Sequence, residues 1–232
     1  MKKEIQVAHI HLETNLRLTE EFVQLLIVEN PTEFYNMVSD LDRQFDGQEG
    51  LFVFSTDEGI ISASKRGAIV SDWFHFELND KKITTLLYKR LENIALGEKL
   101  VRLNDLNTQI MGFLGEIAFG FPFSLEYNEP QPTDYFKVAG LKFENHYETL
   151  EEKIVCYINA LIELKGCEFF VFVNLKSVLS DEKLLQMYEH CQREQVGLLL
   201  IESQKQRSLL SNEKAVIITE DLCEILENYE EM

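Results

Sequence analysis

The chain of 232 residues has few of the features that mark secreted, membrane-spanning or disordered proteins. It has only four cysteines, and they form neither a Cys-x-x-Cys pair nor a zinc-binding spacing. No apolar run reaches the roughly 20 residues that a bilayer crossing needs, and the start lacks the basic-then-apolar pattern of a signal peptide. Because 45% of the residues are apolar and 11% aromatic, the chain can bury a core. We therefore expect a cytoplasmic globular protein with no membrane partner.

Signatures of nucleotide hydrolysis and of covalent catalysis are also missing. A phosphate-binding loop needs glycines and a lysine between a strand and a helix. The first strand-to-helix turn here reads Glu29-Asn-Pro-Thr32, with neither residue and with a carboxylate that repels phosphate. No Gly-x-Ser-x-Gly motif is present, and no cysteine lies in a recognisable catalytic setting. ATP hydrolysis and nucleophilic catalysis are therefore not expected.

Positive charge is scarce but concentrated. The net charge is −18, yet residues 65–102 hold eight basic and five acidic side chains, so this window carries +3. An anionic protein repels nucleic acid, whose binding depends on neutralising phosphates. A solvated helix face is the simplest explanation of such a basic zone. The zone favours polyanion binding only if an oligomer brings several copies of it together.

The order of strand and helix patterns predicts an α/β body interrupted by a helical insertion. Residues 4–11 and 22–28 are strand-like, and a helix with Asn30 as its N-cap follows from Pro31. Residues 51–54 form another strand, which suggests a βαβ arrangement. Later apolar runs at residues 169–173, 196–201 and 215–218 are typical of buried parallel strands. Apart from the strand at residues 215–218, the acidic stretch 213–232 is expected to form a solvated helix face and tail. We place the head domain at residues 1–74 and 145–232 and the inserted helical leg at residues 75–144.

The inserted segment contains two expected helices. Asn79 or Asp80 can cap the first, whose apolar stripe leaves Lys82 and Lys89 together on the roughly opposite face. The second is expected over residues 105–119, and the proline-rich stretch after it is expected to be loop and short turns.

Two groups of side chains could hold a metal ion. His9 and His11 lie in phase on the expected first strand with Glu13 next, although a polar strand face is the favoured interpretation without a fourth ligand. Carboxylates also surround the proline-rich stretch, where flexible oxygen donors suit calcium better than magnesium. Ordinary surface carboxylates would give the same pattern. These carboxylates are Glu116, Glu126, Glu129 and Asp134.

A series of short motifs points to a known family. They are Leu26-Ile-Val-Glu-Asn-Pro-x-x-Phe34, Leu78-Asn-Asp-x-Lys82, Leu125-Glu-Tyr-Asn-Glu129, Phe169-Phe-Val-Phe-Val-Asn174 and Leu179-Ser-Asp-Glu. In their order, spacing and total length the chain resembles the small accessory adaptation protein of type II-A CRISPR–Cas systems. The resemblance implies an α/β head related to P-loop ATPases but lacking the phosphate loop, with an inserted α-helical leg. It further implies a calcium-binding homotetramer ring that holds double-stranded DNA, has no catalytic activity, and associates with the CRISPR integrase and the RNA-guided effector nuclease.

The resemblance assigns the metal role to Glu126 and Glu129 through their motif, while Glu116 and Asp134 are additions from the residues alone. Asn128 departs from the pattern, because relatives can have an acid there, and this departure weakens the expectation for one calcium position. The DNA-facing role is assigned from the charge pattern. It falls to Lys81, Lys82, Lys89, Arg90, Lys99 and Arg102.

The expected function is thus non-catalytic, sequence-independent binding of duplex DNA ends during spacer acquisition. A ring would pool the basic face of each copy around the duplex, while the outer surface stays acidic. Two alternatives stay open: a metal-dependent nuclease that uses Glu116, Glu126 and Glu129 around magnesium, and an interaction scaffold that never contacts DNA.

Overall fold

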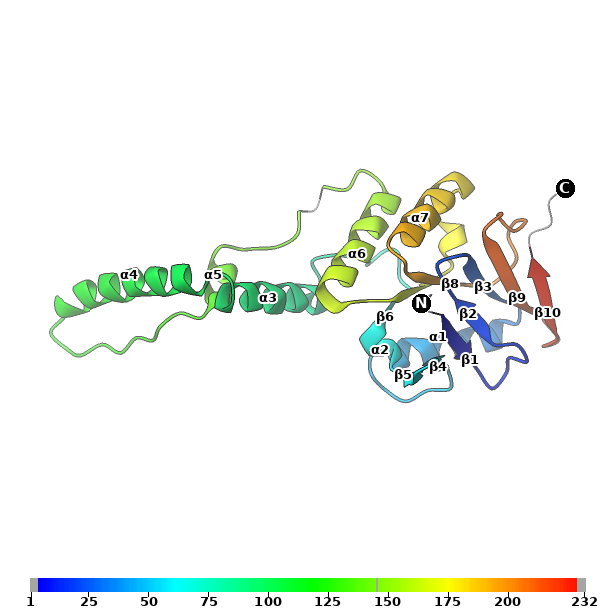
Figure 1. Ribbon diagram of the computed structural model, residues 1–232, viewed down its shortest axis with the longest axis horizontal. Helices are drawn as coiled ribbons and strands as arrows, with labels where there is room; N and C mark the ends of the chain where they lie inside the picture. Colours follow the sequence, from blue (N-terminus) through cyan, green and yellow to red (C-terminus); the bar gives the residue numbers. More distant parts are fainter. Residues whose placement is uncertain (1–3, 145, 229–232) are drawn as a thin grey trace. The chain divides into compact units, whose positions relative to one another are not determined.

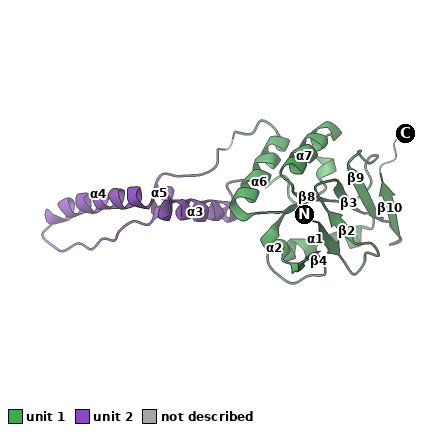
Figure 2. Ribbon diagram, viewed as in Figure 1, with its two compact units in different colours: residues 1–76, 147–232 green, residues 77–146 purple. Residues whose placement is uncertain are grey.

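The computed structural model describes residues 4–144 and 146–228 (Figure 1). The chain divides into two compact units (Figure 2). Residues 1–76 and 147–232 form one, which we call the head, and residues 77–146 form the other, which we call the leg. The sequence-based division placed these boundaries after residues 74 and 144.

A six-stranded, mainly parallel sheet is the centre of the head. Its middle strands are the apolar runs expected from the sequence, because strands covered on both faces need no polar alternation. Only the edge strand β10 runs antiparallel to its neighbour, so the predicted α/β class with a mainly parallel sheet is confirmed. In spatial order the strands are β10 (Glu224–Asn228), β9 (Glu213–Ile218), β3 (Val23–Val28), β8 (Gly197–Glu202), β7 (Phe169–Val173) and β6 (Gly67–Val70).

A second, four-stranded sheet in the head is antiparallel throughout. The expected βαβ unit is wrong, because the strand that follows the first long helix pairs with β1 in this small sheet and not with β3. Strand β1 also ends at Ala8, so His9 and His11 lie beyond it in a turn closed by the Leu12 N–H to His9 carbonyl bond of 3.0 Å. The strand order is β2 (Leu16–Leu18), β1 (Ile5–Ala8), β4 (Val53–Thr56) and β5 (Gly59–Ile61).

Helices cover both faces of the large sheet (Figure 1). Helix α1 (Pro31–Phe45) buries Met37 and Leu41 in a core shared with the small sheet and with one face of the large sheet. The Asn30 side chain caps it, as the sequence predicted, by accepting hydrogen bonds from two backbone N–H groups. The remaining head elements are α2 (Ala63–Arg66), α6 (Leu150–Lys165), the 3₁₀ turn η1 (Leu175–Ser177) and α7 (Asp181–Arg193).

The leg consists of α3 (Lys81–Leu96), α4 (Leu100–Phe119) and α5 (Pro132–Val138). Asp80 caps α3, since its Oδ1 accepts from the Ile83 N–H at 2.8 Å. Helix α4 begins earlier than expected, and α5 replaces the loop predicted for the proline-rich stretch. None of the helices in the described part of the chain combines the length and apolar character needed to span a bilayer.

The end of the chain also departs from the expectation. The strand predicted at residues 215–218 lies in β9, but β10 pairs antiparallel with it where an acidic helix face was predicted, so the helix prediction is wrong as far as Asn228. The tail predicted beyond that residue lies outside the described residues.

A buried polar network lies inside the head. Lys176 places its Nζ 2.8 and 2.7 Å from the two carboxylate oxygens of Glu213, and the Tyr188 hydroxyl donates to the same carboxylate at 2.7 Å. Burial, followed by the charge of Glu213, raises the pKa of Tyr188 well above its usual value. Glu202 joins the network by accepting from the Lys176 backbone N–H at 3.0 Å.

Glu202 gives the head a specific pH dependence. Burial raises its pKa to about 7 from the ordinary 4.5, and its Oε2 has no hydrogen-bond partner among the described residues. The folded state therefore binds the proton more tightly than the unfolded chain does. Stability is lost as the pH rises from about 4.5 to about 7, between the two pKa values. We expect the free energy of unfolding of the parent protein to fall by about 2–3 kcal/mol between pH 4.5 and pH 8 because of Glu202. Glu202→Gln should remove this fall.

Urea denaturation of both proteins at the two pH values measures this difference. The exposed residue Glu194, substituted as Glu194→Gln, is the matched control and should leave the pH profile as it was. Identical profiles for Glu202→Gln and the parent protein would show that Glu202 does not carry the effect.

Candidate nucleic-acid interface and metal ligands

Helix α3 carries the main basic surface of the leg. Lys81, Lys82, Lys89 and Arg90 are all exposed, and helical spacing puts them on one half of the helix. Lys82 and Lys89 lie at its centre with the other two on either side. Two further basic residues come from the next helix, since Lys99 is the N-cap residue of α4 and Arg102 lies in its first turn. Both are exposed.

The opposite face of α3 packs within the leg. Ile83 is buried, and the Tyr88 ring meets Phe136 edge to face at 5.7 Å while its hydroxyl donates to the Leu141 carbonyl at 3.1 Å. Just before the helix, the Asn79 side chain exchanges two hydrogen bonds with the Phe143 backbone. These contacts fix the rotation of α3 and therefore keep its basic half on the leg surface.

The four carboxylates predicted to bind calcium are all exposed, but they lie on different elements. Glu116 belongs to α4, Asp134 to α5, and Glu126 and Glu129 to the segment between them. Glu129 accepts from Asn107 Nδ2 at 2.6 Å, and Asp134 accepts from the Gln131 N–H at 3.0 Å. Their oxygen donors suit calcium, yet within one copy no three of them converge among the described residues.

Asn107 is the residue of this region that the sequence did not reveal. It is buried on α4, donates to Glu129 and to the Pro130 carbonyl, and accepts from the Tyr135 hydroxyl. One asparagine thus ties the segment before α5, and α5 itself, to α4. Nothing in the local sequence distinguishes it from an ordinary helical asparagine, because its partners are more than 20 residues away along the chain.

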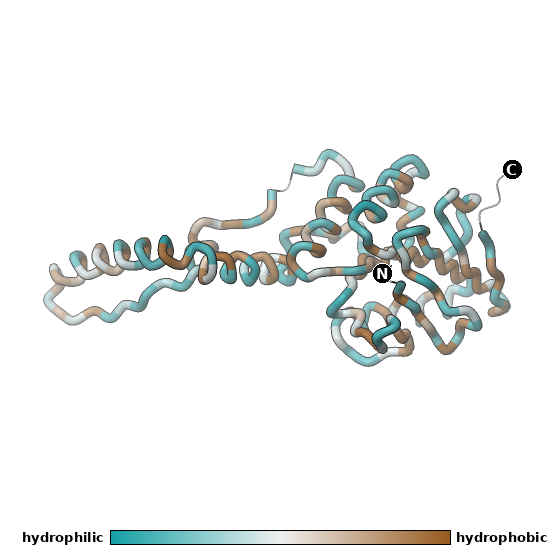
Figure 3. Tube along the Cα trace, in the orientation of Figure 1, coloured by the Kyte–Doolittle hydropathy of each residue, from teal (hydrophilic) through white to brown (hydrophobic). Residues whose placement is uncertain are grey.

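The leg also exposes large apolar side chains. Figure 3 colours the hydrophobic positions along α4 in brown. Leu106, Phe113 and Ile117 share one stripe of that helix and are 41%, 61% and 46% exposed. Phe119 is 93% and Phe123 60% exposed. Exposed apolar side chains in such number are typical of surfaces that associate with another protein surface.

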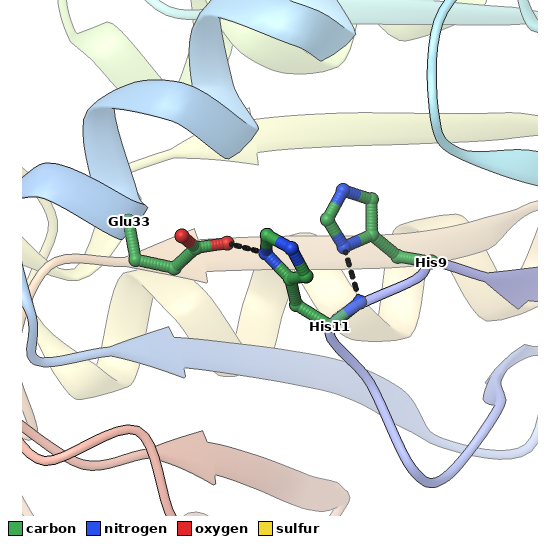
Figure 4. A group of neighbouring side chains, drawn as sticks. All are labelled: His9, His11 and Glu33. Atoms are coloured by element: carbon green, nitrogen blue, oxygen red, sulfur yellow. Dashed lines mark hydrogen bonds and ion pairs between the residues drawn. The ribbon is translucent and has the colours of Figure 1, made fainter.

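In the head, the two histidines singled out from the sequence do come close to a carboxylate. The partner is Glu33 of α1 and not Glu13, which was expected next in phase. The ring of His11 lies between the Glu33 carboxylate and the ring of His9 (Figure 4). Burial, followed by the charge of His11, lowers the pKa of His9.

Comparison with known proteins gives a consistent family match. The family model described as CRISPR-associated protein (Cas_Csn2) matches residues 44–222, more than half of the chain. A CRISPR-associated protein Csn2 of Streptococcus agalactiae is 24% identical over 183 residues, covering 78% of this chain and 82% of that protein. One of Enterococcus faecalis is 22% identical over 198 residues, covering 82% of this chain and 90% of the relative.

Similar solved structures include a nucleotide-free ATP-binding cassette from an ABC transporter, with a TM-score of 0.48 and 8% identity over 94% of this chain and 88% of that one. The ATP-binding cassette MJ0796 bound to ADP and Pi gives a TM-score of 0.45 and 10% identity, with both chains covered completely.

Proposed function

Because the chain belongs to the Cas_Csn2 family of CRISPR-associated proteins, we propose that it binds the ends of double-stranded DNA, without sequence preference and without catalysis, during the acquisition of new CRISPR spacers. The exposed basic half of α3 carries this proposal, since it is a concentrated positive surface on a chain of net charge −18. Contacts from lysine and arginine to phosphates bind any duplex sequence and weaken as salt increases.

One copy supplies too little positive charge to overcome its own acidity, so self-association is part of the proposal. A homotetramer ring would surround a duplex with a basic surface from each copy and leave the acidic surfaces outside. The exposed apolar stripe of Leu106, Phe113 and Ile117 supports association through the leg, because such a surface is normally covered.

Calcium is the ion proposed for the leg, with Glu126 and Glu129 as its first candidates and Glu116 and Asp134 in support. Their exposed carboxylates can combine with backbone carbonyls or with carboxylates of another copy, and six to eight oxygen ligands are usual for calcium. The ion would neutralise the acidic surface of the leg and so favour assembly.

The proposal also includes protein partners and a cellular compartment. The CRISPR integrase and the RNA-guided effector nuclease are the proposed protein partners, and the cytoplasm is the proposed compartment. They rest on the family relationship, which supports a role in a CRISPR system.

A gel-shift titration of linear duplex DNA at low salt, with and without calcium, tests the function. We expect binding that is independent of sequence, strengthened by calcium and weakened steeply by added salt. Absence of binding under every condition would contradict the proposal and favour a scaffold role.

Incubation of the same duplex with magnesium or manganese tests the nuclease alternative. We expect the DNA to stay intact. Metal-dependent cleavage that is abolished by Glu126→Ala would replace the proposal with the nuclease.

A further inference from the structure

We propose that His9, His11 and Glu33 form a binding site in the head for one zinc-class divalent transition-metal ion. One nitrogen of each imidazole and one oxygen of the carboxylate lie within 4.8 Å of one another, and they are the only such group of three or more among the described residues. Two imidazoles and a carboxylate are a ligand set that zinc accepts, leaving a fourth position open.

The hydrogen bonds at the cluster already orient the rings for this role. Glu33 Oε1 lies 2.5 Å from His11 Nδ1 (Figure 4). A carboxylate can only accept, so this nitrogen carries a proton in the ion-free protein. An ion bound by both residues would take the place of that proton. The His11 backbone N–H donates to His9 Nδ1 at 3.2 Å, which keeps that nitrogen free of a proton. A bound ion would replace this long hydrogen bond with a coordination bond.

The separation of the rings also fits coordination. The imidazole centroids of His9 and His11 are 5.2 Å apart and the rings stand at 88° to each other. Two imidazoles that bind one tetrahedral ion through nitrogens at about 2.0–2.1 Å have centroids about 5 Å apart. The spacing of the two rings therefore matches that of two imidazoles bound to one ion.

The surroundings leave room for the fourth ligand. The three side chains line a cavity of about 260 Å³ together with Asn36 and Asp40. Asp40 is not available as a ligand, because its Oδ2 accepts from the Leu51 N–H at 2.7 Å and its Oδ1 pairs with Arg43 at 3.1 Å. Water or a partner's side chain would complete the coordination.

The ion would join two parts of the head that the sequence keeps apart. His9 and His11 follow β1 of the small sheet, whereas Glu33 lies in the first turn of α1, which follows β3 of the large sheet. Binding to the folded state alone stabilises it by mass action, so zinc would raise the melting temperature. Imidazole ligands also distinguish this site from the oxygen-only calcium site proposed for the leg.

Calorimetric titration of chelator-treated protein with zinc tests the proposal, with cobalt as a spectroscopic probe. We expect one zinc ion per chain, a higher Tm with zinc, and visible cobalt absorption of a tetrahedral site. His11→Ala and Glu33→Gln each alter a ligand and should each weaken zinc binding at least about tenfold, since even a change in a partner outside the coordination sphere costs that much. His11 is the preferred position because its side chain is 52% exposed, so its replacement leaves the core intact.

His75→Ala is the matched control. His75 pairs with Asp72 at 2.6 Å, a second histidine–carboxylate pair but without a neighbouring imidazole, and its loss should leave zinc binding unchanged. Zinc binding that is equal in the parent protein and in His11→Ala would overturn the proposal. Displacement of the zinc by excess calcium, or absence of stoichiometric binding, would do the same.

Discussion

Replacing Lys176 by methionine is expected to lower the free energy of unfolding by about 3–5 kcal/mol, because it leaves a buried carboxylate without its counter-charge. The Lys176 and Glu213 side chains are only 4% and 0% exposed. Glu213 would keep its hydrogen bonds from the Tyr188 hydroxyl and the Leu210 N–H, but water could not replace the lost ammonium group. Urea denaturation followed by circular dichroism measures the loss.

Two further variants separate the charge effect from lost packing. Adding Glu213→Gln to Lys176→Met should recover part of the lost stability, since the neutral amide retains an acceptor oxygen without a buried charge. Lys205→Met is the surface control: its 2.6 Å pair with Glu227 is partly exposed and should contribute less than about 1 kcal/mol. A loss for Lys176→Met no larger than for Lys205→Met would contradict the argument.

The double substitution Lys82→Glu with Lys89→Glu is expected to weaken duplex DNA binding at least about a hundredfold at moderate salt. Both side chains lie at the centre of the basic half of α3, and each substitution changes the charge by two units in every copy. The slope of affinity against salt concentration should also become shallower, because fewer counterions are released. Fluorescence anisotropy with a labelled linear duplex measures both quantities.

The pair Arg17→Glu and Arg193→Glu is the control for net charge. Both arginines are exposed in the head, and their reversal lowers the charge of each copy by the same amount. If the two double variants weaken binding equally, general electrostatic repulsion explains the effect and α3 is not the contact surface. Unchanged binding by the Lys82 and Lys89 variant would likewise show that α3 is not the contact surface for DNA.

The elements that sequence predicted well are those whose signal is local. The apolar runs of β3, β7 and β8 identify buried parallel strands whatever surrounds them. Asn30 before Pro31 marked the start of α1 because the cap and the first turn are neighbours in the chain. The charge pattern of α3 was readable for the same reason.

The errors concern pairing and short elements. A strand pattern does not reveal which sheet the strand joins, so β4 was wrongly placed beside β3. Strand β10 is mostly exposed and acidic, which in sequence resembles a solvated helix, and it exists because it pairs with β9. Helix α5 has only seven residues, and its first-turn proline suggested a loop.

Clusters built across long sequence separations could not be predicted at all. The carboxylate beside His11 comes from Glu33, 22 residues away, and the counter-charge of Lys176 comes from Glu213, 37 residues away. The sequence could identify His9 and His11 as an unusual pair, but only the packing of α1 against the small sheet supplies their third member.

The central claim is that an acidic chain binds a polyanion by combining the basic surfaces of several copies around a DNA end. Sedimentation velocity with calcium, comparing a linear duplex with a covalently closed circle of the same sequence, tests it most directly. The account predicts a complex of several protein chains on the linear duplex and little or none on the circle. A single chain bound per duplex, or equal binding to both forms, would contradict it.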